Sequence, residues 1–209
     1  MTTKFPTRRT AGTTVAGFLA LSAMTLSSAA QPAPDLKLFE FSMVASSGAS
    51  TCLPKARGRV TIHSTGSVEI MNVLVTGLPP KTDFDFFVIQ VPKGPFGMSW
   101  YQGDIETDQH GNGHGTFIGR FSIETFVVAP GTAPAPIVFS GLFPDASSNP
   151  STNPIQMYHL GLWFNSPADA QKATCPGATT PFNGEHDAGI QVLNTSNFPV
   201  PSGPLRKVK

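Results

Sequence analysis

Residues 66–91 read GSVEIMNVLVTGLPPKTDFDFFVIQV and contain two strand-like runs separated by a turn. The first run, residues 66–76, is rich in the β-branched and apolar residues that favour strands. The GLPP sequence at 77–80 ends this run, because glycine and two adjacent prolines interrupt regular structure. The second run, residues 82–91, is apolar at successive positions in its second half, which is typical of a strand buried on both faces.

The remainder of the chain repeats this pattern of short strands between turns. Further strand-like runs occupy residues 38–43, 57–63, 98–108, 114–128, 137–143, 155–164 and 189–195. One short helix is predicted near residues 167–173, because Ser166 is a favourable cap, Pro167 follows it and Asp169 stands three residues after it. Strands do not alternate with helices, so we expect an all-β fold. The preferred architecture is a single antiparallel β-sandwich of Ig-like or Greek-key type with about nine strands, and a partly open barrel is the alternative.

Composition supports one folded domain. The chain of 209 residues has 20 Gly and 20 Pro, which argues against a helical bundle or a coiled coil. Its 40% hydrophobic content, with 16 Phe, is enough to fill a core and argues against disorder. We expect a single domain over residues 31–209, with long loops near residues 129–136, 143–154 and 173–189.

Residues 1–30 have the pattern of an export signal. The segment begins with the basic residues Lys4, Arg8 and Arg9. An apolar stretch at 15–26 follows, too short to span a bilayer as a helix, and small residues at 28–30 predict cleavage before Gln31. We therefore expect a secreted or cell-surface protein with no transmembrane segment after signal removal. An uncleaved anchor is the alternative.

Charge and cysteine content agree with export. Loss of residues 1–30 would reduce the 14 Lys and Arg to 11 against 13 Asp and Glu, a formal charge of −2. This balance lacks the basic character of a nucleic-acid-binding protein. The two cysteines, Cys52 and Cys175, predict one disulfide in an oxidising compartment. Two free thiols are the alternative.

Gly111-Asn112-Gly113 is a strong turn signal between the runs 98–108 and 114–128. A three-residue loop would pair the runs so that one face is apolar and the other holds nearly all the charges. In this register His110 lies opposite His114, and Asp104 lies opposite Arg120 as a cross-strand ion pair.

The charged face of this hairpin has three interpretations. It is a solvated outer face, or it binds a ligand, or it holds a metal ion. The predicted ligand-binding residues are Trp100, Gln102, Asp104, Arg120 and Glu124, in which an aromatic plane stands beside groups that bind a sugar or a peptide. The predicted metal ligands are His110, His114 and Asp108, which would hold a divalent ion.

Three segments of the chain also resemble a known group of proteins. The GLPP turn at 77–80, GDIETD at 103–108 and the GNG turn at 111–113 together resemble small secreted bacterial β-sandwich domains, in which a similar turn precedes a central strand and a similar hairpin follows. The resemblance covers roughly residues 57–124. It implies the fold and no reaction.

The leading hypothesis for function is a non-catalytic binding or interaction module. Its partner would be a carbohydrate, a peptide or a cell-envelope component. The sequence contains no nucleophile or phosphate-binding motif, so no catalytic residue is assigned and no cofactor other than the metal ion is expected. One alternative is an enzyme or metalloprotein that uses His110 and His114. Another is a structural envelope protein whose Pro-rich loops mediate packing.

Overall fold

The computed structural model describes residues 38–127 and 155–209. The expected export signal at 1–30, the strand at 137–143 and the loops at 129–136 and 143–154 lie outside these ranges. Among the described residues, no helix is long and apolar enough to cross a membrane.

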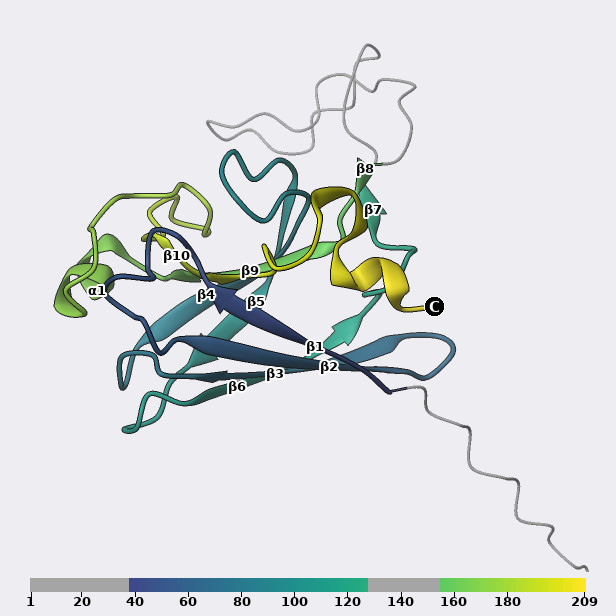
Figure 1. The fold of residues 1–209 in the computed structure, drawn as a ribbon, viewed down its shortest axis with the longest axis horizontal. Helices are drawn as coiled ribbons and strands as arrows, with labels where there is room; N and C mark the ends of the chain where they lie inside the picture. The colour runs from purple at the N-terminus through teal and green to yellow at the C-terminus, as the bar shows by residue number, and fades with distance from the viewer. Residues whose placement is uncertain (1–37, 128–154) are drawn as a thin grey trace, which may run out of the picture. The chain divides into compact units, whose positions relative to one another are not determined.

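Within the described residues, ten strands form nearly all of the regular structure (Figure 1). They are β1 (Leu38–Ala45), β2 (Arg57–Ser64), β3 (Glu69–Thr76), β4 (Asp83–Ile89), β5 (Ser99–Glu106), β6 (Gly113–Gly119), β7 (Phe126–Val127), β8 (Ile155–Gln156), β9 (His159–Phe164) and β10 (Gln191–Asn194). Eight of them make one sheet in the order β5-β4-β9-β10-β1-β2-β3-β6, and β7 pairs with β8. Every pairing is antiparallel. The predicted all-β antiparallel class is confirmed.

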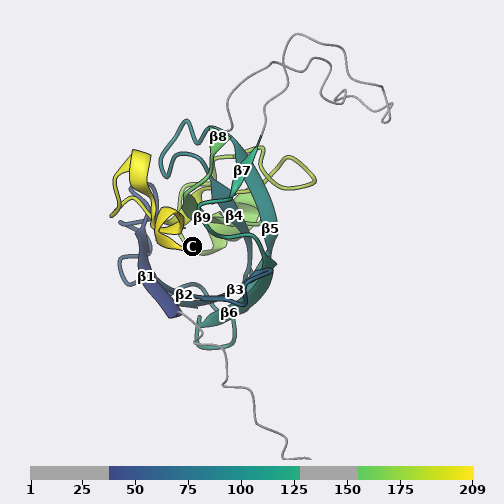
Figure 2. The same ribbon diagram turned by 90° about the vertical axis from the view of Figure 1, so that its right-hand side faces the viewer.

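The eight-stranded sheet curls round until its two edge strands, β5 and β6, come near each other (Figure 2). The fold is therefore nearer to the partly open barrel than to two packed sheets. The turn that joins β5 and β6 has one bridge, from Thr107 to Gly113 at the start of β6, and a hydrogen bond from the amide of Asp108 to the carbonyl of Asn112.

The predicted ladder between residues 98–108 and 114–128 is therefore wrong. β5 pairs with β4 and β6 pairs with β3, so that His114 lies opposite Leu74. Interior side chains account for the separation of the two edge strands. Phe117 of β6 stacks on Phe86 of β4, with ring centroids 5.0 Å apart, and lies against Gly103 of β5. The aromatic rings fill the space that closer approach would need.

The core lies inside the curled sheet. On β2 and β3 it takes alternate residues, as a half-buried strand requires. β4 and β9 are buried on both faces, because loops cover their outer side. A second apolar cluster forms there, and it consists of Phe87, Ile89, Trp163 and Ala188 with Phe96 and Phe182 packed against them. The double burial predicted for the second half of 82–91 is confirmed.

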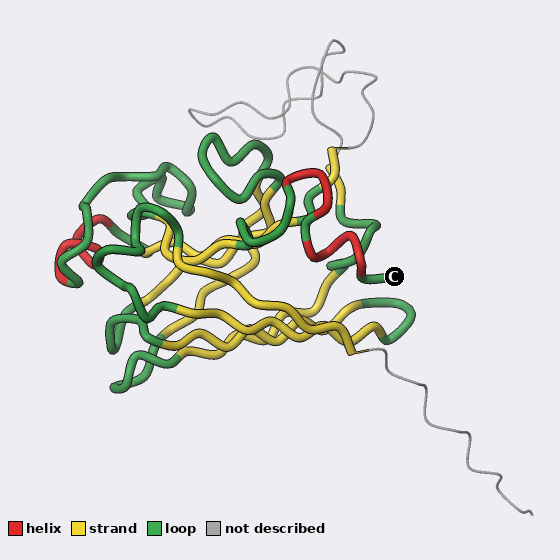
Figure 3. Tube along the Cα trace, in the orientation of Figure 1, coloured by secondary structure: helices red, strands yellow, loops and turns green. Residues whose placement is uncertain are grey.

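The short helix, red in Figure 3, is as predicted. The predicted disulfide is also present. α1 (Pro167–Lys172) begins after Ser166, whose side chain accepts a hydrogen bond from the amide of Asp169. Two further helical segments are single 3₁₀ turns, η1 (Val200–Ser202) and η2 (Pro204–Lys207). Cys52 and Cys175 are bonded, with their Cα atoms 5.3 Å apart across a sequence separation of 123 residues.

Candidate ligand groove

A groove of about 510 Å³ opens at one end of the curled sheet, where β5 and β6 diverge. Its walls come from both edge strands, from the loop after β6, and from β7. The residues that give it chemical character are Trp100, Gln102, Ile118, Arg120, Glu124 and Phe126. Four of the five predicted ligand-binding residues are therefore brought together here.

Trp100 supplies an exposed aromatic plane. It lies opposite Val88 in the β4–β5 pairing, on the side of the sheet that faces the core. It nevertheless has 60% of its surface exposed, because it lies at the open end of the curled sheet. Ile118 and Phe126 are also exposed, at 66% and 45%. A group of exposed large apolar side chains around a groove marks an interaction site.

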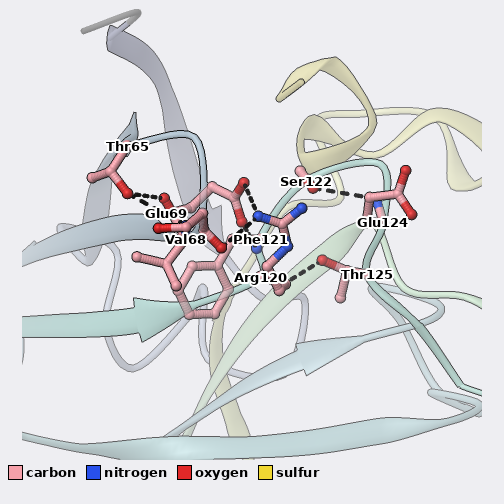
Figure 4. Close-up of polar contacts among 9 residues, drawn as sticks. Thr65, Val68, Glu69, Arg120, Phe121, Ser122, Glu124 and Thr125 are labelled. Atoms are coloured by element: carbon pink, nitrogen blue, oxygen red, sulfur yellow. Dashed lines mark hydrogen bonds and ion pairs between the residues drawn. The ribbon is translucent and has the colours of Figure 1, made fainter. Parts of the chain in front are cut away.

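Arg120 is held by a buried carboxylate that the sequence analysis did not identify (Figure 4). Its guanidinium lies 3.5 Å from Oε1 of Glu69, a side chain that is 2% exposed, and donates to the carbonyl of Ser67 at 2.9 Å. The other oxygen of Glu69 accepts the amide hydrogen of Phe121 at 2.8 Å. The ion pair predicted between Arg120 and Asp104 is therefore wrong, and Glu69 takes the place of Asp104.

The loop after β6 is shaped by its own hydroxyl groups (Figure 4). Thr125 donates from Oγ1 to the carbonyl of Arg120 at 2.6 Å. The amide of Glu124 donates to Oγ of Ser122 at 3.2 Å. These bonds fold the loop so that Glu124 and Arg120 both line the groove. An anchored arginine beside a carboxylate gives the groove a donor and an acceptor without a large net charge.

Asp104 lies outside this groove, contrary to the prediction that it shares a face with Trp100. The register between β4 and β5 shifts between Phe86 and Phe87, which leaves Gln102 as the extra residue of a β-bulge. A bulge breaks the two-residue alternation of a strand. Residues beyond it therefore point to the opposite face from the one that simple alternation predicts.

The three predicted metal ligands are not gathered into one site. Oδ1 of Asp108 accepts the amide hydrogens of His110 and Asn112 at 2.8 and 2.9 Å. Both hydrogen bonds, and most of all the one from Asn112, lower the pKa of Asp108. The carboxylate of Asp108 is thus engaged by the backbone of the turn. His114 is on the β3–β6 ladder instead of facing His110. Within residues 38–127 and 155–209, no three His, Cys, Asp or Glu side chains are grouped to hold a metal ion.

A second cavity, of about 580 Å³, lies on the outer face of the sheet and was missed by the sequence analysis. Asp85 and Asp104, opposite each other on β4 and β5, line it together with Tyr101. Burial, and then the neighbouring charge of Asp104, raise the pKa of Asp85 to about 7. The sequence feature that could have revealed this cavity is Asp85, an aspartate inside the run DFDFFVI, whose second half is buried on both faces.

Comparisons of the chain with protein-family models, with curated proteins and with solved structures found no match. The chemistry of the two cavities is therefore the basis for assigning a function.

Proposed function

We propose that this protein is a non-catalytic binding module that acts outside the cytoplasm, and that the groove at the open end of the sheet binds carbohydrate. The observation that carries the proposal is the meeting of Trp100, Gln102, Arg120 and Glu124 around one cavity. The Cys52–Cys175 disulfide supports an oxidising location, because such bonds persist chiefly outside the cytosol.

The groove matches the two kinds of contact that a sugar ring needs. The exposed face of Trp100 offers an apolar plane for the C–H face of a pyranose ring. Gln102, Glu124 and Arg120 place amide, carboxylate and guanidinium groups at its margin, and these planar groups suit vicinal hydroxyls. Because Glu69 already pairs with Arg120, the groove favours a neutral ligand over a strong anion.

The proposal predicts that Trp100→Ala lowers carbohydrate affinity by at least about tenfold, since it removes the stacking plane. We expect its melting temperature to stay within about 2 °C of the wild type, because most of the side chain is exposed. Neutral cello- and chito-oligosaccharides, screened on an array and then measured by calorimetry, are suitable probes because their rings have flat apolar faces.

Leu74→Ala is the matched control. Leu74 is also a large exposed apolar residue, at 48%, but it lies on β3 outside the groove. It should leave oligosaccharide affinity unchanged. Two results would contradict the proposal: no oligosaccharide binding by the wild type, or equal affinity in the wild type and Trp100→Ala.

A further inference from the structure

The second cavity lies on the opposite face of the sheet from the groove. Along β4, the side chains of Phe84, Phe86 and Val88 enter the main core, whereas Phe87 and Ile89 belong to the outer apolar cluster. Asp85 alternates with the core residues and so points outward with Phe87. Its cross-strand neighbour is Asp104, and directly opposed residues on antiparallel strands have Cβ atoms about 5 Å apart.

Asp85 is unusual for a carboxyl group because it is 2% exposed and incompletely bonded. Its Oδ2 atom has no hydrogen-bond partner among the described residues. A buried polar atom without a partner is costly, and a buried charge without one is more costly still. The side chain nevertheless lines the cavity, where a ligand would reach it.

The charged groups that raise the pKa of Asp85 are acidic. Asp83 lies two residues away on β4, and Asp104 and Glu106 are on β5. Glu185 lies in the loop between α1 and β10. Tyr101 of β5 donates to Oδ1 of Asp104 at 2.6 Å, and the position facing Asp85 on β9 is the neutral Trp163. The described residues that line the cavity include no Lys, Arg or His.

Aromatic rings form another part of the wall. Tyr101 is 48% exposed and packs edge-on against Phe87. Phe182, from the loop after α1, has its ring 5.4 Å from that of Phe87 and lines the cavity beside Tyr101. The adjoining loop is anchored, because Asn183 donates to the carbonyl of Asn165 at 2.9 Å and accepts from the amide of Asp187. These bonds fix the loop that carries Phe182 and Glu185 beside the sheet.

We propose that this outer cavity, which we call the acidic cavity, binds a guanidinium group. A guanidinium carries its donors in a planar fork that fits carboxylates, and it also stacks on aromatic faces. The fork matches the opposed carboxyls of Asp85 and Asp104, and Tyr101 and Phe182 supply the faces. A compact ammonium ion would use the carboxyls but gain less from the rings.

Binding is coupled to proton release. Without ligand, a proton on Asp85 relieves its repulsion with Asp104, and the guanidinium takes the place of that proton. Since the pKa of Asp85 is about 7, the ionised form rises roughly tenfold between pH 6 and pH 8. Affinity for a guanidinium should therefore increase by about tenfold over the same interval.

The test is calorimetric titration of the wild type with N-acetyl-arginine amide, a peptide-like guanidinium, and with agmatine, a free one. Binding of either supports the proposal, and their relative affinities identify the source of the group. N-acetyl-citrulline amide is the neutral control, because a urea replaces the guanidinium, and it should bind at least about tenfold more weakly. At pH 6.5 the observed enthalpy should also vary with the ionisation enthalpy of the buffer.

Asp85→Asn should reduce affinity for the guanidinium at least about tenfold and abolish its dependence on pH. Glu124→Gln, which removes a carboxylate from the carbohydrate groove instead, should leave guanidinium binding unchanged. The proposal would be overturned if neither guanidinium compound bound, if citrulline bound equally well, or if Asp85→Asn retained the wild-type affinity. None of these results depends on oligosaccharide binding, so the two proposals are tested separately.

Discussion

Two buried acidic residues, Glu69 and Asp85, differ in the partners of their carboxyl groups. Glu69 has Arg120 on one oxygen and the amide of Phe121 on the other. Among the charged neighbours of Asp85, Asp104 raises its pKa most, and Oδ2 of Asp85 has no hydrogen-bond partner in the part of the chain that the structure describes. In the second arrangement burial, and then the charge of Asp104, raise the pKa of Asp85 and favour its neutral form.

At the residue scale we predict that Asp85→Asn stabilises the protein at high pH. Because the pKa of Asp85 in the folded state is about 7, above its usual value near 4, the folded state holds the proton more strongly. The stabilisation that Asp85 contributes to the folded state is complete below about pH 4 and is lost as the pH rises through 7. Asparagine stays neutral, so the variant should exceed the wild type at pH 8 by up to about 4 kcal/mol in free energy of unfolding.

Urea unfolding at pH 4 and pH 8 measures this difference. Asp108→Asn is the control, because Asp108 is an exposed aspartate whose pKa is lowered by amide hydrogen bonds. It should give no gain at pH 8. An Asp85→Asn variant whose advantage over the wild type is the same at both pH values would show that Asp85 does not titrate as argued.

At the scale of single elements, the β-bulge at Gln102 divides β5 between two sites. Before the bulge, Trp100 faces the groove between β5 and β6. After it, Asp104 faces the acidic cavity, where it accepts a hydrogen bond from the hydroxyl of Tyr101. Without the extra residue, strict alternation would place Trp100 and Asp104 on the same face. One strand can therefore serve two separate cavities.

For α1 we predict that Ser166→Ala lowers the free energy of unfolding by about 1 kcal/mol. The helix has two turns at most, so the loss of the bond from the amide of Asp169 to the Ser166 hydroxyl affects a large part of it. Ser166→Thr keeps the hydroxyl and should stay close to the wild type. Equal destabilisation by both substitutions, in the same urea experiment, would show that the cap is not the cause.

At the scale of the whole molecule, the disulfide connects distant parts of the chain. Cys52 follows β1 and Cys175 follows α1, so the bond closes a loop of more than a hundred residues. Cysteine to alanine at both positions should reduce the free energy of unfolding by about 5 kcal/mol, through the entropy that the unfolded chain regains. Thermal unfolding of the double variant and of the wild type, both without reductant, measures the loss. Equal melting temperatures would contradict this account.

Several features of this protein follow from the sequence alone because their causes are local or leave no choice of partner. The alternation of short apolar runs with Gly and Pro turns determines the all-β class. Ser166, Pro167 and Asp169 determine the helix, since cap and first turn are neighbours in sequence. With two cysteines in the chain, an oxidising compartment permits a single intramolecular pairing.

Other features were decided by the tertiary structure. The turn at 111–113 is local, but whether the free edge of β5 also pairs with β6 depends on how the interior rings fill the curled sheet. Arg120 meets Glu69 because β6 lies beside β3. Asp85 faces Asp104 because of the β4–β5 register, and the bulge at Gln102 places this pair on the face away from Trp100. Register and bulges arise from competition among distant segments, so residue spacing along one strand does not determine them.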